Sequence, residues 1–312
     1  MTLPPRLQAY VSYFERLTSQ PANRWDGFLL DKATDNPHHL LNQLAFPCYA
    51  LAAMSLHTDV DQAERERCRQ AMAALIDRML QRRVWAYWSM EREKQHAART
   101  DPVEKGNAAY SGHLAMMIGM FEVATGDRRY DDTFTFTWAP YERFTYDHHQ
   151  LTEQLWQQMR MSPYHGVESQ RGTIHLLAMN QVLWAIALHD ELHGSEYASV
   201  NDGWLRFVKQ RLVLRGPRMI NRGIFSPIFR TRLRMPMPLG CNLADAWTLA
   251  LLTPIVPRMD QPLSCHVSLG YQTAPSSPAL LPQGEKGVSQ TAKQPAEQHT
   301  NRLPTRRIRP LC

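Results

Sequence analysis

The sequence has no apolar segment long enough to cross a membrane, which needs about 20 uncharged residues in a row. Its mean hydropathy is −0.43. The N-terminal segment MTLPPRLQAY has no apolar stretch behind a basic start, so the pattern of a secretory signal is missing. We therefore expect a cytoplasmic protein without a membrane span. With 44% hydrophobic residues among 312, the chain is able to bury a substantial core.

Cysteine is also scarce, and its spacing excludes two classes of small stabilised fold. The five cysteines are Cys48, Cys68, Cys241, Cys265 and Cys312, and no two of them form a C-x-x-C pair. Neither a disulfide framework nor a zinc cluster of cysteines fits this pattern. Cys48 and Cys68 fall within helical patterns, which predicts buried or half-buried thiols.

The net charge of +6 raises the possibility of a nucleic-acid partner. Much of the positive charge lies in residues 212–236 and 302–312. No zinc-finger, RNA-recognition or helix-turn-helix signature accompanies these basic stretches. We therefore interpret them as solvated charge and expect no nucleic-acid partner.

Strand signals are sparse and helical periodicity is abundant, so we predict an all-α fold. The predicted helices span residues 5–18, 38–56, 60–82, 110–125, 148–160, 174–193, 197–213 and 241–253. Gly194 follows one of them in the usual C′ position. The string TDPVEK predicts the start of another helix, with Thr100 or Asp101 as its cap and Glu104 in a capping box.

Two segments, HLAMMIGMFEVA and IHLLAMNQVLWAIALH, are apolar around most of a helical circumference, whereas residues 60–83 are amphipathic. Helices that are apolar on all sides are buried. Buried helices that alternate with amphipathic ones indicate an inner layer and an outer layer, as in an α/α toroid with a ligand site at its mouth. A globin-like or irregular bundle would show a similar alternation.

The last third of the chain differs in composition. Residues 214–239 are rich in Arg, Pro and Gly, and we predict a long excursion with a short hairpin there. Residues 257–312 are rich in Pro, Ser, Gln and Thr and lack an apolar period, which predicts a disordered tail. The expected organisation is one helical domain over residues 1–256, followed by this tail over 257–312.

The string YSGHLAMMIGM supplies the first candidate site. Tyr110 and His113 are three residues apart and share a helix face. His113 also lies in line with Met116, Met117 and Met120. An imidazole beside an apolar face can bind or protonate a ligand there. The structural alternative is a buried histidine that bonds a backbone carbonyl.

The string PYHGVESQRG, residues 163–172, supplies a second candidate. Glu168 is a candidate general acid or base, Ser169 a donor or nucleophile, and Arg171 an anion-binding or neutralising group. The G-x-S-x-G elbow of α/β-hydrolases is absent. The structural alternative is an ordinary loop with a helix cap.

The helix that follows carries further polar groups. His175 and Met179 are one turn apart, and Asn180 and Gln181 interrupt an apolar pattern. Buried amides need partners, so these two either line a cavity or tie neighbouring helices together. The pairs HH at 38–39 and 148–149 have no H-E-x-x-H or similar spacing, and adjacent residues diverge on a helix. We therefore predict no metal.

Several of these strings together resemble the linalool dehydratase/isomerase family. The matching stretches are RRVWAYW, TDPVEKGNAAYSGHLAMMIGMFEVATGDRRY, HGVE, MNQVLWAIALHDELHGSEY and AWTLA, in the family's order between about residues 40 and 253. The resemblance implies a six-hairpin α/α toroid that dehydrates or isomerises a small allylic terpene alcohol without a cofactor. It implies a catalytic role for His113, with Tyr110 at the tyrosine position of the family's Y-x-G-H motif.

The resemblance also exposes departures from the family pattern. The family's two active-site cysteines fall on Ser169 and Met179, and the acidic residue after the first one falls on Gln170. Glu15 is the nearest counterpart of an early aspartate. A serine is far less acidic than a thiol, and a thioether has no proton to give. The toroid is expected to be incomplete, because the tail offers no further helices after AWTLALLTP.

Three functional hypotheses follow from these observations. The first is a lyase or isomerase in which Glu168 or Ser169 replaces the thiols, beside a pocket formed by Met117, Met120, His175, Met179 and Asn180. The second is an inactive relative that binds an apolar ligand or a protein partner. The third, sugar isomerisation, is disfavoured because the inner helices lack clustered carboxylates. The resemblance leaves a homo-oligomer open.

Overall fold

The computed structural model describes residues 4–30, 39–57, 60–89, 100–214, 224–237 and 242–255. All of them belong to one unit that spans residues 1–270. The expected boundary after residue 256 and the tail over 257–312 lie outside the described residues. Within the described part, no helix is both long and apolar enough to span a bilayer.

Most of the described chain is helical. The helices are α1 (Pro5–Thr18), α2 (His39–Ser55), α3 (Gln62–Met79), α4 (Arg82–Trp85), α6 (Ala108–Thr125), α7 (His148–Met161), α8 (Leu176–His193), α9 (Ser199–Phe207), a π-helical turn (Val208–Leu212) and α10 (Asn242–Ile255). These bounds match the predicted helices closely. The exception is 197–213, which divides into α9, the π-helical turn and the start of a strand.

Local signals explain where several helices begin and end. Asp61 caps α3 and Asp147 caps α7, and each carboxylate accepts a backbone N–H three residues further on. Gly194 ends α8 with a φ of +67°, as its sequence position predicted. The predicted helix start in TDPVEK is wrong. Asp101 accepts the N–H groups of Val103 and Glu104 in a turn, and α6 begins only at Ala108.

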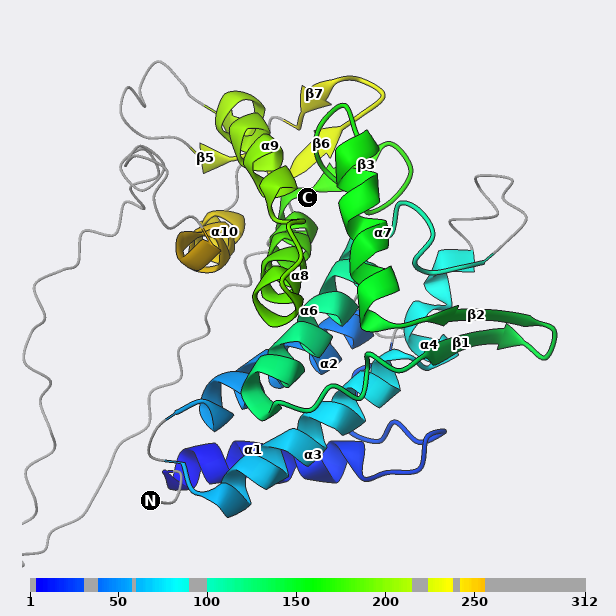
Figure 1. Cartoon of the computed structure of the whole chain (residues 1–312), viewed down its shortest axis with the longest axis vertical. Coiled ribbons are helices and arrows are strands. Elements are labelled where there is room, and N and C mark those ends of the chain that lie inside the picture. The colour runs from blue at the N-terminus through cyan, green and yellow to red at the C-terminus, as the bar shows by residue number, and fades with distance from the viewer. Residues whose placement is uncertain are drawn as a thin grey trace, which may run out of the picture. The chain divides into compact units, whose positions relative to one another are not determined.

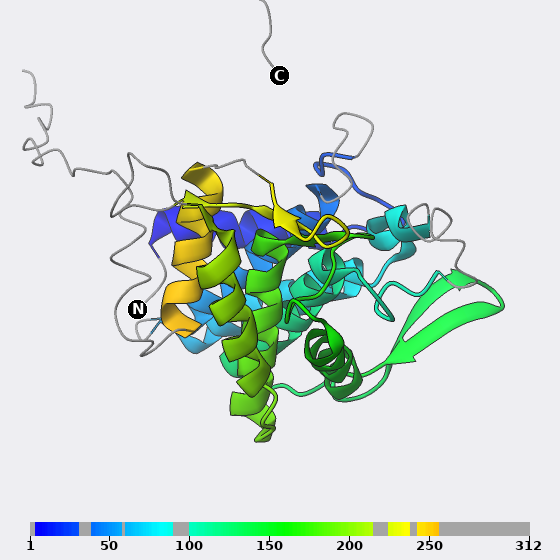
Figure 2. The same ribbon diagram turned by 90° about the horizontal axis from the view of Figure 1, so that it is seen from above.

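The helices pack in successive layers around α6 and α8 (Figures 1 and 2). Helix α1 packs on α3, and α2 and α3 both contact α6 from the same side of the molecule. Helix α8 covers α6 from the other side, with α7 and α10 against it. The two segments that were predicted to be buried are therefore the central pair. The six-hairpin toroid implied by the family resemblance remains an expectation.

The central pair packs closely because α6 carries glycines where it meets α8. A Cβ on Gly112 would lie 2.8 Å from Cγ2 of Val182, and a Cβ on Gly119 would lie 3.0 Å from Cβ of Leu188. Such separations are shorter than ordinary van der Waals contact, so even a methyl group would force the facing atoms of α8 to shift. Seven residues separate the two glycines, so about two helical turns of α6 lie against α8. This contact places residue 113 of α6 opposite residues 178–181 of α8.

The prediction of an all-α fold is wrong in detail, because small antiparallel sheets accompany the helices. Strands β1 (Phe134–Ala139) and β2 (Glu142–Tyr146) form a hairpin that extends beyond the helices (Figure 1). A second sheet has the order β3-β6-β7 and a third pairs β4 with β5. Their bounds are β3 (Thr173–His175), β4 (Val213–Leu214), β5 (Ile224–Phe225), β6 (Ile228–Arg230) and β7 (Met235–Pro236).

These strands are short, so their alternation is too brief to stand out from the helical pattern. In β1 the alternation is present, since Phe134 and Phe136 are buried and Thr135 is exposed. The β6–β7 hairpin confirms the excursion predicted between residues 214 and 239. Its pairing with β3 brings Pro227 and Ile228 next to the start of α8.

Candidate functional site

The central helices enclose one side of a cavity of about 320 Å³ that contains His113. Its wall is mainly apolar, with a few polar groups that face inward. The lining residues are Asn42, Ala109, His113, His175, Leu177, Ala178, Gln181, Pro227, Ile228 and Trp247. A small, mostly apolar cavity with few convergent polar groups is typical of a site for a small organic ligand.

Helix α2 positions the imidazole of His113. The Tyr49 hydroxyl lies 2.7 Å from His113 Nδ1, and the planes of the two rings are nearly parallel, with an angle of 13° between them. Burial raises the pKa of Tyr49 well above its ordinary value, so the phenol keeps its proton. A protonated phenol at this distance donates to Nδ1 or accepts from it, and in both cases it orients the ring. Phe46 and Trp247, in edge contact with each other, complete the aromatic surroundings.

Helix α8 contributes an amide to the same cavity. Gln181 is almost completely buried and lines the cavity, and neither its oxygen nor its nitrogen has a hydrogen-bond partner among the residues that the structure describes. The neighbouring Asn180 is fully buried and its amide is likewise without a partner. Buried amides without partners are rare, because each unpaired polar group costs free energy. A polar group of a ligand in the cavity would supply the partner for Gln181.

The other predicted pocket residues differ in whether they line this cavity. His175 lines it directly, at the junction of β3 and α8. Met117 is fully buried and Met120 packs against the core. Tyr110 is also fully buried, and its hydroxyl donates to the carbonyl of Met79 at 2.7 Å. Its phenol is thus engaged at the end of α3.

Glu168 lies beside a larger hollow, of about 620 Å³, between α7 and the loop that precedes β3. Its two carboxylate oxygens accept hydrogen bonds from Thr231 Oγ1 at 2.7 Å and from the N–H of Gly172 at 3.0 Å. Its carbonyl accepts the N–H of Ala108, the first residue of α6. The Glu168 side chain therefore holds its loop against the β6–β7 hairpin, as well as facing this hollow.

The loop that carries Ser169 contacts Met179. Val167, two residues before Ser169, donates its N–H to Sδ of Met179 at 3.1 Å. Ser169 is 2% exposed, and its hydroxyl has no hydrogen-bond partner. A serine nucleophile needs a base within hydrogen-bond reach. Among the residues that the structure describes, none accepts the Ser169 hydroxyl.

The sequence interpretation missed two residues that line the His113 cavity, Asn42 in the first turn of α2 and Trp247 in α10, and it missed Tyr49, which contacts His113. Tyr49 and Trp247 lie in helices whose apolar pattern suggested only core packing. The spacing of the aromatic residues at 46 and 49, which share a helix face, is a signal that could have found Tyr49.

Histidines and carboxylates also gather at the far ends of α6 and α8. The donor atoms of Glu122, Asp131, His148 and His193 lie within 4.8 Å of one another, and those of His149, His189 and His193 form a second such group. Histidine nitrogen and carboxylate oxygen are ligands that transition metals accept. The sequence prediction of no metal rested on spacing along the chain, which does not show this convergence.

The protein is mostly helical, and a small, mainly apolar cavity lies beside its buried central helix pair. A family model described as linalool dehydratase/isomerase matches residues 42–280. The chain belongs to this family. The match includes His113 and Tyr49, and it extends past residue 256, where the sequence predicted the helical domain to end.

Proposed function

We propose that the protein dehydrates or isomerises a small apolar allylic alcohol of the terpenoid class in the His113 cavity. One observation carries this proposal: a histidine bonded to the phenol of the half-buried Tyr49 faces a cavity whose wall is otherwise mostly apolar. The family membership supports the same class of reaction. The unpartnered Gln181 amide is the group we assign to the substrate hydroxyl.

In this proposal His113 acts first as acid and then as base. Protonated His113 gives a proton to the substrate hydroxyl, the C–O electron pair leaves with water, and an allylic cation forms. Neutral His113 then accepts a proton from the adjacent carbon, and that C–H electron pair becomes the new double bond. The net change is alcohol to diene plus water, and the enzyme is restored. The apolar wall shelters the cation from solvent.

The test is turnover by the purified full-length chain, followed by gas chromatography of the products. We expect a triene or a rearranged alcohol from linalool, which already has two double bonds, with loss of at least a hundredfold in rate in His113→Ala. Tyr49→Phe removes only the orienting hydroxyl and should lower the rate less. His57→Gln, at an exposed histidine in the turn after α2, is the matched control. An unchanged rate in His113→Ala would refute the acid–base role.

One observation favours a second function, binding without turnover. The Ser169 hydroxyl is buried without a base, and Met179 is the acceptor of a backbone N–H. If these positions replace the family's cysteines, the thiol pair is lost. A ligand that raises the melting temperature without yielding product would support this function. In that case the double variant Ser169→Cys/Met179→Cys should restore product formation.

A further inference from the structure

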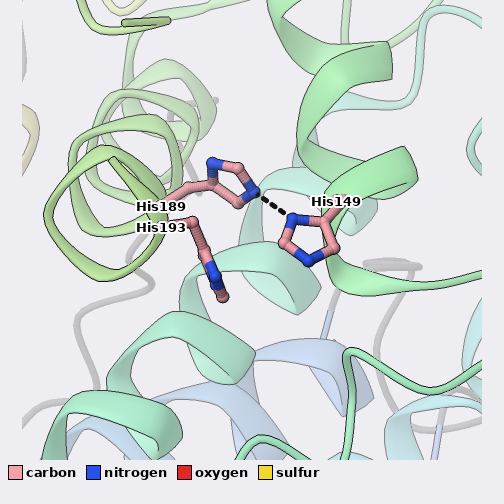
Figure 3. A group of neighbouring side chains, drawn as sticks. All are labelled: His149, His189 and His193. Carbon is pink, nitrogen blue, oxygen red and sulfur yellow. Dashed lines mark hydrogen bonds between the residues drawn. The ribbon is translucent and has the colours of Figure 1, made fainter. Parts of the chain in front are cut away.

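A second cluster of functional side chains lies at the opposite end of the central helices from His113. Glu122 is nine residues after His113 on α6, which corresponds to about 13.5 Å along the helix axis. The cluster brings together four segments: the last turn of α6, the loop before β1, the start of α7 and the last turn of α8. Figure 3 shows three of its histidines, His149 from α7 and His189 and His193 from α8.

The cluster is largely buried. The side chains of Glu122 and His148 are 0% exposed and that of His193 is 7% exposed, while Asp131 is 25% exposed. The ion pairs of Glu122 within the described part of the chain are with histidines only. Burying a carboxylate away from lysine or arginine is costly unless another cation is close.

His193 Nε2 and Glu122 Oε2 form a hydrogen bond of 3.1 Å, but the other close contacts among the donor atoms are not hydrogen bonds. His148 Nδ1 lies 2.9 Å from Glu122 Oε1, yet the two atoms are not aligned, and both remain without a hydrogen-bond partner. Asp131 Oδ1 is 3.7 Å from His149 Nε2 and 3.8 Å from His193 Nε2, and it too has no partner. Hydrogen bonds are shorter than this. The atoms converge on a common point more than they pair with each other.

A chain of hydrogen bonds shows which histidine nitrogen atoms of the cluster donate and which accept. The Ser195 hydroxyl donates to Asp190 Oδ1, so Ser195 accepts from His189 Nδ1, which lies 2.7 Å away. His189 Nε2 then acts as an acceptor for His149 Nδ1 at 3.0 Å. A neutral His189 has only one proton to donate, and Ser195 receives it.

The consequence falls on the other nitrogen of His149. In its neutral form, His149 has its proton on Nδ1, so its Nε2 presents a lone pair toward Asp131 Oδ1. Two acceptors that face each other repel unless a cation lies between or beside them. A cation at this point, either a histidine proton or a bound metal ion, would remove this repulsion.

We propose that this cluster binds one divalent transition-metal ion of the zinc class, through Glu122, Asp131, His148 and His193. His149 lies at the edge of the site, and His189 orients it as an outer-shell partner. Metal–ligand bonds of about 2.0–2.2 Å hold tetrahedral donors about 3.3–3.6 Å apart. Three of the six separations among the four donor atoms are 2.9, 3.1 and 3.8 Å, and all six are within 4.8 Å, so small side-chain shifts would bring the donors to this spacing.

The site is structural in character. Four protein ligands close a tetrahedral ion and leave no position for a substrate. The ligands come from both ends of the β1–β2 hairpin region and from α6 and α8, so the ion ties the ends of the central helices together. The His113 cavity is more than a helical turn away from this cluster. The test of metal binding and the test of turnover are therefore independent, and a negative result in one does not decide the other.

The test measures zinc binding by the full-length chain after dialysis against a chelator. We expect one tight equivalent in the wild type and in the control His57→Gln, and none in Glu122→Gln or His193→Gln. His189→Gln should weaken binding by about 10–100-fold, as for an outer-shell partner. Magnesium, which prefers all-oxygen sites, should not compete. A tight equivalent that survives in Glu122→Gln and His193→Gln would overturn the proposal.

Cobalt spectroscopy of the wild type covers the case in which a variant fails to fold. Co²⁺ in this site should show the visible bands of a tetrahedral ion with nitrogen and oxygen ligands. Strong sulfur-to-cobalt charge-transfer bands would assign the ion to cysteines and overturn the proposal. Absence of any tight equivalent in the wild type would do the same.

Discussion

The close contact between α6 and α8 allows a quantitative prediction for Gly112→Ala. The added Cβ would lie 2.8 Å from Cγ2 of Val182, 3.2 Å from the Val182 backbone nitrogen and 3.4 Å from the Ala178 carbonyl. A side-chain atom can rotate away, but backbone atoms of α8 move only with the helix. The substitution therefore pushes the two central helices apart.

The expected cost has two opposing parts. Overpacking of a tight core costs about 1–3 kcal/mol. The better helix propensity of alanine offsets about 1 kcal/mol of this. Because backbone atoms of α8 are among the neighbours, we expect a net loss of about 1–2 kcal/mol in the free energy of unfolding. For a folded unit of this size, that corresponds to a drop in melting temperature of about 2–8 °C.

Gly119→Ala is the matched control on the same helix. There the added Cβ meets only side-chain atoms of Leu188, at 3.0, 3.2 and 3.7 Å. A change of leucine rotamer moves Cγ and Cδ1 but not Cβ, so the 3.0 Å contact is relieved only by a small shift of the helices. Because this contact is longer than the 2.8 Å contact at Gly112 and the nearest atoms do not include backbone atoms of α8, we expect a smaller drop in melting temperature than for Gly112→Ala. The assay is thermal unfolding followed by circular dichroism. If Gly112→Ala is as stable as the wild type, the helices are not held together by this contact, and the position of His113 opposite α8 is less constrained than we infer.

Three further outcomes are expected. Tyr110→Phe removes the buried bond to the carbonyl of Met79 and should lower the free energy of unfolding by about 1–3 kcal/mol in denaturant titrations; no change would contradict the bond. Burial raises the pKa of Cys48 far above its ordinary value, so peptide mapping should find this thiol unalkylated in the native protein even at pH 9, and alkylated once it is unfolded. Ser169→Ala removes a buried hydroxyl without a partner and should leave stability unchanged or raise it by about 1 kcal/mol, whereas a clear loss would reveal a missing partner.

Much of the helical framework was predictable from the sequence because periodicity and capping are local properties. The predicted bounds of α1, 5–18, are those observed, and the glycine at 194 ends α8 as predicted. The start of α6 was not predictable in the same way. The string TDPVEK contains every element of a capping box, yet Asp101 uses its carboxylate for a turn and Gly106 adopts a φ of +73°. A local signal failed here because the surrounding contacts favoured a different backbone.

The candidate site likewise has one part that the sequence predicted and another part that only the structure reveals. His113 was predicted from its motif, and the apolar character of α6 and α8 predicted that it would be buried. Its partner Tyr49 is 64 residues away in sequence, so only the packing of α2 against α6 could reveal that contact. The distinction between Glu168, which bonds the β6–β7 hairpin, and Ser169, which bonds no base, likewise depends on strands too short to predict.

The sequence by itself determined the helices, the two buried segments among them and the family to which the chain belongs, because these follow from short-range patterns. The tertiary structure alone decided which polar groups meet. The adjacent histidines at 148 and 149 point in different directions from their helix, and their spacing along the chain predicted no metal. Packing brings each of them to residues of other segments, 122, 131, 189 and 193, because α7 crosses the ends of α6 and α8. Convergence of side chains from distant segments is a property of three-dimensional packing, which periodicity along the chain does not record.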